Sequence, residues 1–381
     1  MTIFDRRPRL RWAVPAAAGA LILGGALAGT VGASADAGLA PRTAADLLVD
    51  LQSPQTDTVS GTVVATADLG LPELPTGMGS SADVTALVSG SNTLRVWSDG
   101  PDRMRVAMIG TAEESDIVRN GRDVWAWSSA DNTADHYVLP ERDASATTVE
   151  SSPAAGLPST PQEAAVMALQ AVDDTTEVTT SGVASVAGRP VYELILTPKQ
   201  SETLVASVVI AMDAETRVPL RVQVFSTAMA DPAYEVAFTS VDFTAPDPGL
   251  FDFTPPPGAT VTEHATPSAD AMAPGPSDNP VGADTPTIVG TGWSQVMIAT
   301  VPEGATAGST DGPTGGDAAD ATSAAGADAL ALLEALPRTS GSWGSGRVLN
   351  GTLFSAILTD DGQMAIGAVT PETLGAALAA Q

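Results

Sequence analysis

The amino-acid sequence predicts a mainly β protein of the α+β class, with one large antiparallel sheet and a small α+β unit at its C-terminal end. Between residues 91 and 139, apolar and polar residues alternate with the period of two that is typical of half-buried strands. Turn residues interrupt the alternation at short intervals, which predicts a meander of four or five strands. No helical pattern separates the later strands, and strands that follow each other without helices between them pair antiparallel.

The meander places a set of apolar side chains on one face. Alternation over residues 92–98 puts Leu94 and Val96 on that face, and alternation over 103–108 adds Met104, Val106 and Met108. Further along, Asn120-Gly121 separates two alternating runs. This pair predicts a hairpin with a type I′ turn, in which both central residues need positive φ.

A second group of strands continues the same surface. It follows a helix that is expected over residues 161–172, where Thr160, Pro161 and Glu163 suit the N-cap, N1 and N3 positions. A shorter helix is expected to begin at Thr43 and to end near Leu51. The strands after the second helix carry two further alternating triplets: Tyr192, Leu194 and Leu196, and Leu220, Val222 and Val224.

The first 35 residues have the pattern of an export signal. Four arginines within residues 6–11 precede an uncharged run over residues 12–31, and Ala33-Ser34-Ala35 fits a small-x-small cleavage site. An uncleaved signal anchor is the alternative, because a run of about 20 apolar residues could just span a bilayer. Either way, the rest of the chain is expected in the cell envelope, in a periplasm-like space or on the outer face of the plasma membrane.

Composition changes divide the exported part. Residues 43–261 hold the predicted sheet, and residues 262–285 are rich in Pro, Ala and Asp, as linkers are. Residues 286–381 form the predicted small unit. Within it, the Gly/Ala/Thr/Asp-rich loop 302–326 is expected to be disordered, and a helix is expected over 327–336.

Charge and residue types exclude several classes of function. The formal net charge is −28 with a single lysine, Lys199, and an acid excess of that size argues against binding to nucleic acid, whose phosphates require basic clusters. The absence of cysteine excludes disulfides, thiolate metal sites, a cysteine nucleophile and a lipid-modified N-terminal cysteine. The two histidines, His136 and His264, lie far apart in the sequence without a metal-ligand pattern. No Gly-x-Ser-x-Gly elbow or phosphate-binding glycine motif occurs. We therefore expect no cofactor, no metal and no enzymatic activity.

Five strings carry a family resemblance: "LRVWSDGPDRMRVAMIG", "DIVRNGRDVWAWSSADNTADHYVLP", "GRPVYELILTPK", "VVIAMDAETRVPLRVQVF" and "EVAFTSVDFTAPDPGLFDFTPPPGATV". In their order and spacing they resemble the LolA-type lipoprotein carrier superfamily, which includes RseB-like regulators. The resemblance covers about residues 43–261. It implies an unclosed, strongly curved antiparallel half-barrel with helices on its concave side. The extra unit over 285–381 and the long loop over 69–88 depart from the carrier pattern.

The resemblance implies that acyl chains lie on the concave face. On this sequence the apolar residues expected to line that cavity are Leu94, Val96, Met104, Val106, Met108, Tyr192, Leu194, Leu196, Leu220, Val222 and Val224. A structural interpretation of the same residues, as a dry core between sheet and helices, stays open. The alanine-rich, nearly lysine-free composition is typical of high-GC actinobacteria, whose LprG-type glycolipid carriers share the implied fold.

Two functions follow from the resemblance. The first is an extracytoplasmic carrier that binds the acyl chains of a lipoprotein or glycolipid and exchanges them with a membrane-bound donor or acceptor protein. The second is an RseB-like regulator that senses lipid or lipoprotein and binds an anti-sigma-type partner, with the C-terminal unit as the contact.

Overall fold

A computed structural model gives the structure of the protein. It describes residues 39–52, 56, 58–71, 89–109, 114–139, 158–170, 172–182, 184–264, 287–300, 336 and 338–380. The chain divides into two units, residues 1–42 and 43–381, and the elements below belong to the second. The predicted export signal, the linker from residue 265 onward, the loop 302–326 and all but the last residue of the helix expected over 327–336 lie outside the described residues.

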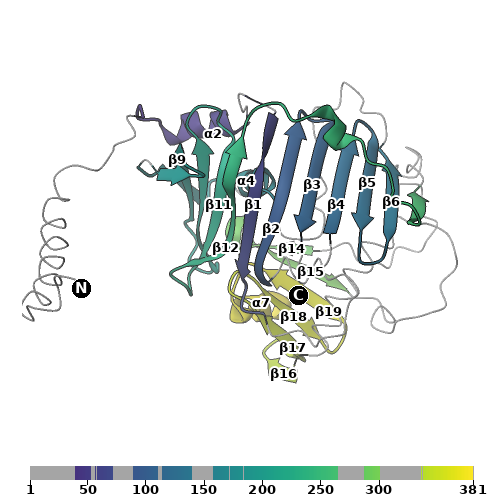
Figure 1. Ribbon diagram of the computed structural model, residues 1–381. Helices are drawn as coiled ribbons and strands as arrows, with labels where there is room; N and C mark the ends of the chain where they lie inside the picture. The colour runs from purple at the N-terminus through teal and green to yellow at the C-terminus, as the bar shows by residue number, and fades with distance from the viewer. Residues whose placement is uncertain are drawn as a thin grey trace, which may run out of the picture. The chain divides into compact units, whose positions relative to one another are not determined.

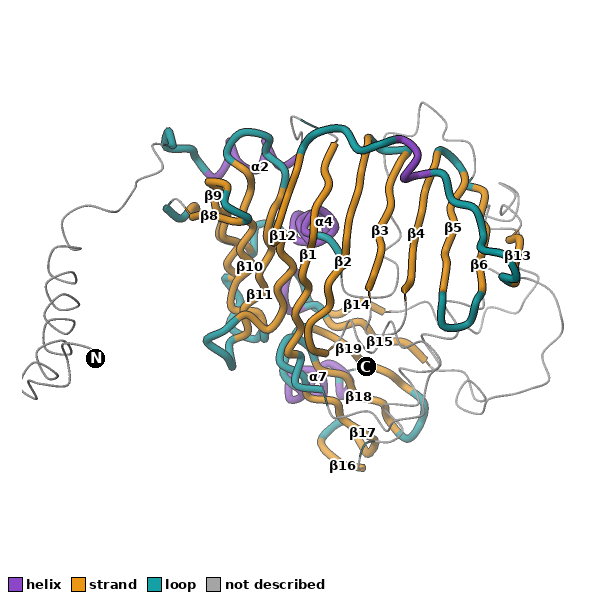
Figure 2. The backbone as a smooth tube through the Cα atoms, in the orientation of Figure 1, coloured by secondary structure: helices purple, strands orange, loops and turns teal. Residues whose placement is uncertain are grey.

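Most described strands belong to one large sheet (Figures 1 and 2). Its thirteen strands are β1 (Thr58–Asp68), β2 (Ser89–Asp99), β3 (Arg103–Ile109), β4 (Glu114–Asn120), β5 (Asp123–Ser128), β6 (Thr133–Val138), β7 (Thr176–Thr180), β8 (Ala184–Val186), β9 (Arg189–Pro198), β10 (Val205–Asp213), β11 (Pro219–Ser226), β12 (Pro232–Asp242) and β13 (Thr260–His264). The strand order is β13-β6-β5-β4-β3-β2-β1-β12-β11-β10-β9-β7, with β8 also paired to β9. The end strands β13 and β7 do not pair with each other, so the sheet is unclosed. The predicted fold class is confirmed.

The predicted meander is present as β2 to β6, five strands that pair in chain order. The hairpin at Asn120-Gly121 is confirmed, but its predicted turn type is wrong. Asn120 pairs with Asp123, so the two central residues of the turn are Gly121 and Arg122. Gly121 has a φ of 64°, whereas Arg122 is not among the residues with positive φ. Positive φ at the first central residue alone is the pattern of a type II′ turn, which also favours glycine there.

The expectation of an all-antiparallel sheet is wrong at one edge, where β13 pairs in parallel with β6. The cause is the route of the chain after β12. Residues 244–259, which include the 3₁₀ helix η3 (Pro248–Phe251), cross the meander strands before β13 begins (Figure 1). This crossover brings the chain to the far edge of the sheet, where β13 runs in the same direction as β6. β13 also continues to His264, three residues into the predicted linker.

Two helices pack on one face of this sheet, which we call the inner face. α2 (Ala44–Gln52) begins with a capping box, since the Asp46 amide donates to the Thr43 hydroxyl at 3.2 Å and the Thr43 amide donates to Asp46 at 3.3 Å. α4 (Pro161–Gln170) begins as predicted, with the Glu163 amide donating to the Thr160 hydroxyl at 3.2 Å. The two helices bury their apolar faces in one core with the sheet: Leu47 and Leu51 from α2, and Ala164, Ala165 and Ala168 from α4.

The C-terminal residues form a second sheet. Its six strands are β14 (Thr287–Val289), β15 (Val296–Thr300), β16 (Arg338–Gly341), β17 (Gly344–Asn350), β18 (Ser355–Thr359) and β19 (Gln363–Gly367), in the order β14-β15-β19-β18-β17-β16. The 3₁₀ helix η4 (Gly292–Ser294) separates the first two strands. α7 (Pro371–Ala379) is capped by Thr370 and buries Leu374 and Leu378 in a core with Val296 and Ile357.

Hydrogen bonds join the two sheets at several places. The Trp293 indole N–H donates to the Thr176 hydroxyl at 2.8 Å. The Leu204 amide donates to the Ala368 carbonyl at 2.8 Å. Trp293 also packs against the core of the large sheet together with Leu353 and Phe354. The second sheet therefore contributes side chains to the core of the first.

Candidate functional site

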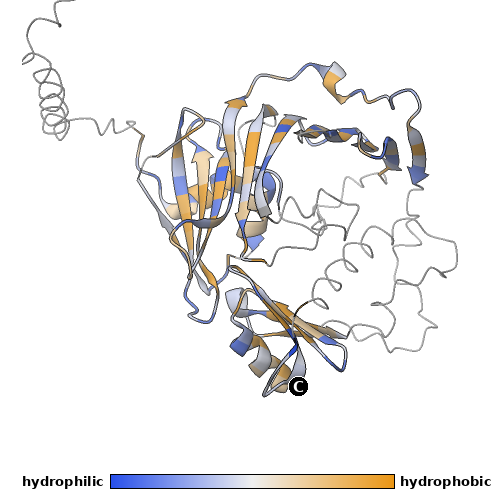
Figure 3. Ribbon diagram, turned by 60° about the horizontal axis from the view of Figure 1, so that its bottom comes forward, coloured by the Kyte–Doolittle hydropathy of each residue, from blue (hydrophilic) through white to orange (hydrophobic). Residues whose placement is uncertain are grey.

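Strand register places all eleven apolar residues of the predicted cavity on the inner face. Residues paired directly across antiparallel strands point to the same side of a sheet. Leu94 pairs with Met108 and, on its other side, with Val63 of β1. In the other half of the large sheet, Leu194 of β9 pairs with Ile210 of β10, which pairs with Val222 of β11. Figure 3 shows apolar and polar residues interspersed along the strands of the large sheet.

These eleven residues differ in what covers them. Over β9 and β11 they form a dry core beneath α2 and α4: Leu194, Leu196 and Leu220 are fully buried, and Val222 is 1% exposed. Tyr192 and Val224 are half-buried at the margin of the same core. A ligand would have to displace a helix to reach this region. The structure therefore uses six of the predicted residues, those of β9 and β11, in packing between sheet and helices.

Over β2 to β5 the inner face borders a cavity of about 270 Å³. Leu94, Val106 and Met108 line it, and Val106 and Met108 are only half-buried. Val96 is buried beside them, and Met104 is half-buried at the rim of the same face. The exposed fraction of Ile117 reaches 48%, which is high for an inward-facing isoleucine. This half of the inner face is the candidate site.

Sequence reasoning missed the part of the lining that lies beyond β3. The structure adds three apolar residues, Ile117, Ala126 and Trp127, and six polar ones, Ser115, Asp116, Ser128, Thr133, Asp135 and Ser159. Most of these could have been found by carrying the register through the Asn120-Gly121 hairpin, because Val106 pairs with Ile117 and Ile117 with Ala126. Ser159 could not, since it lies on the segment that enters α4.

Ser159 is held at the cavity by two neighbouring contacts. The Ser159 amide donates to the Glu163 carboxylate at 2.9 Å. The hydroxyl of Tyr234, on the inner face of β12, donates to the carbonyl of Pro158. Burial raises the pKa of Tyr234 far above its ordinary value, so this hydroxyl keeps its proton. The start of α4 is thus fixed at the boundary between the covered and the uncovered half.

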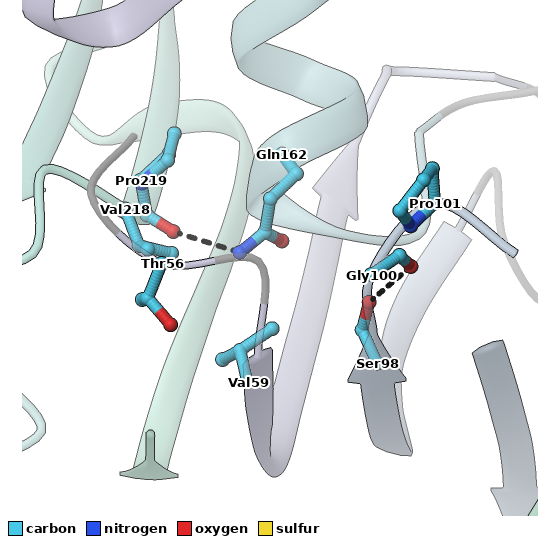
Figure 4. A pocket seen from close by; sticks show the side chains of 8 residues that line it. All are labelled: Thr56, Val59, Ser98, Gly100, Pro101, Gln162, Val218 and Pro219. Carbon is cyan, nitrogen blue, oxygen red and sulfur yellow. Dashed lines mark hydrogen bonds between the residues drawn. The ribbon is translucent and has the colours of Figure 1, made fainter. Parts of the chain in front are cut away.

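A second cavity, of about 320 Å³, lies on the other side of the α4 N-terminus (Figure 4). It is lined by Thr56, Val59, Ser98, Gly100, Pro101, Gln162, Val218 and Pro219. The side-chain amide of Gln162 donates a hydrogen bond to the Pro219 carbonyl at 3.3 Å. Four apolar residues line this cavity and six line the first, so it offers a smaller apolar surface to an acyl chain.

The crossover over residues 244–259 lies on part of the outer face of the meander (Figure 1). Phe253 lies against Trp125, with ring centroids 5.4 Å apart, and near Trp127 at 6.4 Å. Arg105 forms an ion pair with the buried Asp116 at 2.6 Å and also reaches the Leu250 carbonyl at 3.5 Å. The two faces of the same strands therefore differ: aromatic rings and an ion pair lie on the outer face, and the cavity borders the inner face.

Both histidines of the chain lie where β13 meets β6, a contact that we call the histidine seam. On the outer face, His136 of β6 lies between Glu263 at 2.6 Å and Asp123 at 2.9 Å and stacks on Trp125. Burial alone would lower the pKa of His136, but its hydrogen bonds to the two carboxylates outweigh burial and raise the pKa above the ordinary value. On the inner face, His264 of β13 lies 2.9 Å from Asp135.

Other kinds of site find no support in the part of the chain that the structure describes. No group of three or more histidine or acidic residues there has the geometry of a metal site. Among the same residues, no helix combines the length and the apolar character needed to span a bilayer.

Comparisons with known proteins agree with the fold and the location. Residues 80–263 match the family described as "Predicted periplasmic protein (DUF2092)", and the search of curated proteins gave no match. The description of this family agrees with the predicted location outside the cytoplasm. The search of solved structures matched LolA- and MucB-type proteins, which the sequence strings resemble.

Three solved structures illustrate this similarity. MucB in the Pseudomonas aeruginosa MucA/MucB complex shares 15% identity over 88% of this chain and 95% of its own, with a TM-score of 0.40. A LolA superfamily protein from Nitrosomonas europaea shares 12% identity over 56% of this chain and 99% of its own (TM-score 0.23). A putative outer membrane lipoprotein-sorting protein domain from Vibrio parahaemolyticus shares 11% identity over 55% of this chain and 94% of its own (TM-score 0.22). At these identities and TM-scores the similarity carries no argument about function.

Proposed function

We propose that this chain is an extracytoplasmic binding protein and not an enzyme, and that it carries acyl chains of a lipoprotein or glycolipid against the β2–β5 part of its inner face. The observation that carries the proposal is the uneven cover of one apolar face. α2 and α4 bury the β9–β11 half, while the β2–β5 half borders a cavity and leaves Ile117 at 48% exposure. An apolar surface that a protein keeps open on one side is suited to an apolar ligand.

The energetics suit a carrier. Each CH₂ group moved out of water contributes roughly 0.8 kcal/mol, so a lipid chain leaves a membrane only for a comparable apolar surface. The cavity of about 270 Å³ lies just below the range of roughly 300–1,000 Å³ that is usual for ligand pockets. It therefore suits one acyl chain, and an anchor with several chains requires the inner face to open further. Exchange with a membrane-bound donor or acceptor protein belongs to this proposal.

Ile117→Asp tests the proposal in the exported chain. Ile117 is half exposed, so the protein should fold with aspartate there, but the carboxylate would lie where the acyl chain is expected. We expect titration with a fluorescent fatty-acyl probe to show at least a tenfold loss of affinity. Ile288→Asp is the matched control, because Ile288 is 65% exposed on β14 of the second sheet. Wild-type affinity in the Ile117 variant would contradict the proposal.

A regulator is the second candidate, and the second sheet favours it. That sheet is hydrogen-bonded to the large one, and its edge strand β16 is exposed along its whole length. An exposed edge strand can pair with an extended segment of a partner protein, such as an anti-sigma-type protein. The two candidates differ in what the purified protein holds. Mass spectrometry of organic extracts should detect lipid for a carrier; a protein partner without tightly held lipid would favour the regulator.

A further inference from the structure

The inner face of the meander changes in polarity from one strand to the next. One row of paired residues runs from Leu94 through Met108 to Ser115, Ser128 and Thr133. The neighbouring row runs from Val96 through Val106, Ile117 and Ala126 to Asp135. Both rows are apolar on β2 and β3 and polar on β6. A ligand that lies along either row meets apolar side chains at one end and hydrogen-bonding groups at the other.

The polar end of these rows is organised by β13. Asp135 lines the cavity, its side chain is 37% exposed, and its carboxylate lies 2.9 Å from His264. His264 stacks on Tyr137, with ring centroids 4.2 Å apart and an angle of 5° between the rings. Burial and the Asp135 carboxylate raise the pKa of Tyr137, so its phenol keeps its proton. A carboxylate, hydroxyl groups and a flat pair of rings thus lie along one edge.

Positive charge is missing from this lining. The described residues around the cavity include no arginine or lysine. The inner-face arginine of β4, Arg119, is engaged with Asp102 at 3.3 Å and with the Gly121 carbonyl at 3.1 Å. Phosphate groups are usually bound by arginine or lysine, and here they would meet the Asp135 carboxylate in a chain of net charge −28.

We infer that the β5–β6 edge of the cavity holds an uncharged, hydroxyl-rich headgroup, such as a sugar, while the acyl chain lies over β2 to β4. This inference rests on the proposed function and adds the chemical class of the polar end. A carboxylate accepts hydrogen bonds from ligand hydroxyls, and serine and threonine can both donate and accept. The stacked Tyr137 and His264 rings offer a flat surface to the apolar side of a sugar ring.

The test compares lipids that share their acyl chains and differ in the headgroup. Short-chain glycosyl diacylglycerol, phosphatidylglycerol and a trimethylammonium diacyl lipid would each compete with the fluorescent acyl probe for the exported chain. We expect the glycosyl lipid to bind at least tenfold more tightly than phosphatidylglycerol and more tightly than the cationic lipid. Equal or tighter binding of either charged lipid would overturn the inference.

The variant Asp135→Asn tests whether the Asp135 carboxylate sets the headgroup preference. The variant removes the negative charge but keeps the size of the side chain. We expect the preference for glycosyl lipid over phosphatidylglycerol to fall at least threefold. Asp361→Asn, in the exposed β18–β19 turn, should keep the wild-type preference. An unchanged preference in the Asp135 variant would overturn the headgroup inference and leave the proposed function standing. Failure of the wild-type chain to bind the probe or any of the lipids would reject both the inference and the proposed function.

Discussion

The two halves of the large sheet carry the same apolar pattern on their inner face but use it differently. Over β9 to β11, Leu194, Leu196 and Leu220 are fully buried beneath helices. Over β3 to β5, Val106 and Met108 are half-buried and Ile117 is half exposed at a cavity. The difference teaches that period-two alternation specifies an apolar face, whereas the helices decide which part of that face becomes core and which stays open to a ligand.

The largest expected effect is a difference in stability between substitutions in the two halves of the sheet. Leu194→Ala removes a fully buried side chain from the dry half, so the free energy of unfolding should fall by about 2–5 kcal/mol. Ile117→Ala truncates a half-exposed side chain, and its cost should stay below about 1 kcal/mol. Denaturant titration of both variants checks the comparison. Equal losses would mean that the β2–β5 half is packed as tightly as the other.

A larger residue should close the cavity without unfolding the protein. Ala126 lines the cavity and is half-buried, so Ala126→Phe would fill space that the acyl chain needs. We expect at least a tenfold loss of acyl-probe affinity with little change in unfolding midpoint. Ala299→Phe, on the second sheet, is the matched control and should bind normally. Full affinity in the Ala126 variant would show that the ligand does not use this cavity.

The contact between the two sheets should have a smaller effect. Trp293→Phe keeps an aromatic ring in the core but removes the indole N–H that donates to the Thr176 hydroxyl. Loss of this hydrogen bond should lower the free energy of unfolding by about 1 kcal/mol. Thr176→Val removes the acceptor instead, and the double variant should lose no more than either single variant. Additive losses in this double-mutant cycle would contradict the contact.

The smallest expected effect is the pH dependence of the histidine seam. The pKa of His136 is raised in the folded chain, so its contribution is complete below the unfolded pKa of about 6.5 and is lost as pH rises through the folded pKa. Glu263 and Asp123 are more than half exposed, which limits the gain to less than about 1 kcal/mol. Hydrogen exchange of β13 amides, corrected for intrinsic rates, should show weaker protection at about pH 8.5 than at about pH 6. In His136→Gln this difference should disappear, and its persistence would assign the pH dependence to another group.

Local patterns in the sequence predicted the strands, both helix starts and the shared inner face, because alternation and capping involve residues that are close in the chain. Thr160 and Glu163 cap α4 as their spacing requires. The type II′ turn at Gly121 differs from the expected type because the register between Asn120 and Asp123 sets the turn, and register is fixed by a whole strand pair.

Local sequence patterns could not predict the parallel strand or the histidine seam. His136 and His264 lie 128 positions apart in the sequence, and only the crossover over residues 244–259 brings them to adjacent strands. Local patterns also could not predict where the cavity ends and the dry core begins. Nothing in the alternation of Leu194 and Leu196 distinguishes them from Val106 and Met108; the placement of α2 and α4 does.

Photocrosslinking tests the central claim most directly. The exported chain would be loaded with a fatty-acyl probe that carries a diazirine on its alkyl chain, irradiated and mapped by peptide mass spectrometry. We predict crosslinks in β3 to β5, at Val106, Met108, Ile117 and their neighbours, and none in β9 to β11. Crosslinks that fall mainly in β9 to β11 would show that α2 or α4 moves aside for the ligand, and would contradict the division of the inner face into a dry half and a binding half.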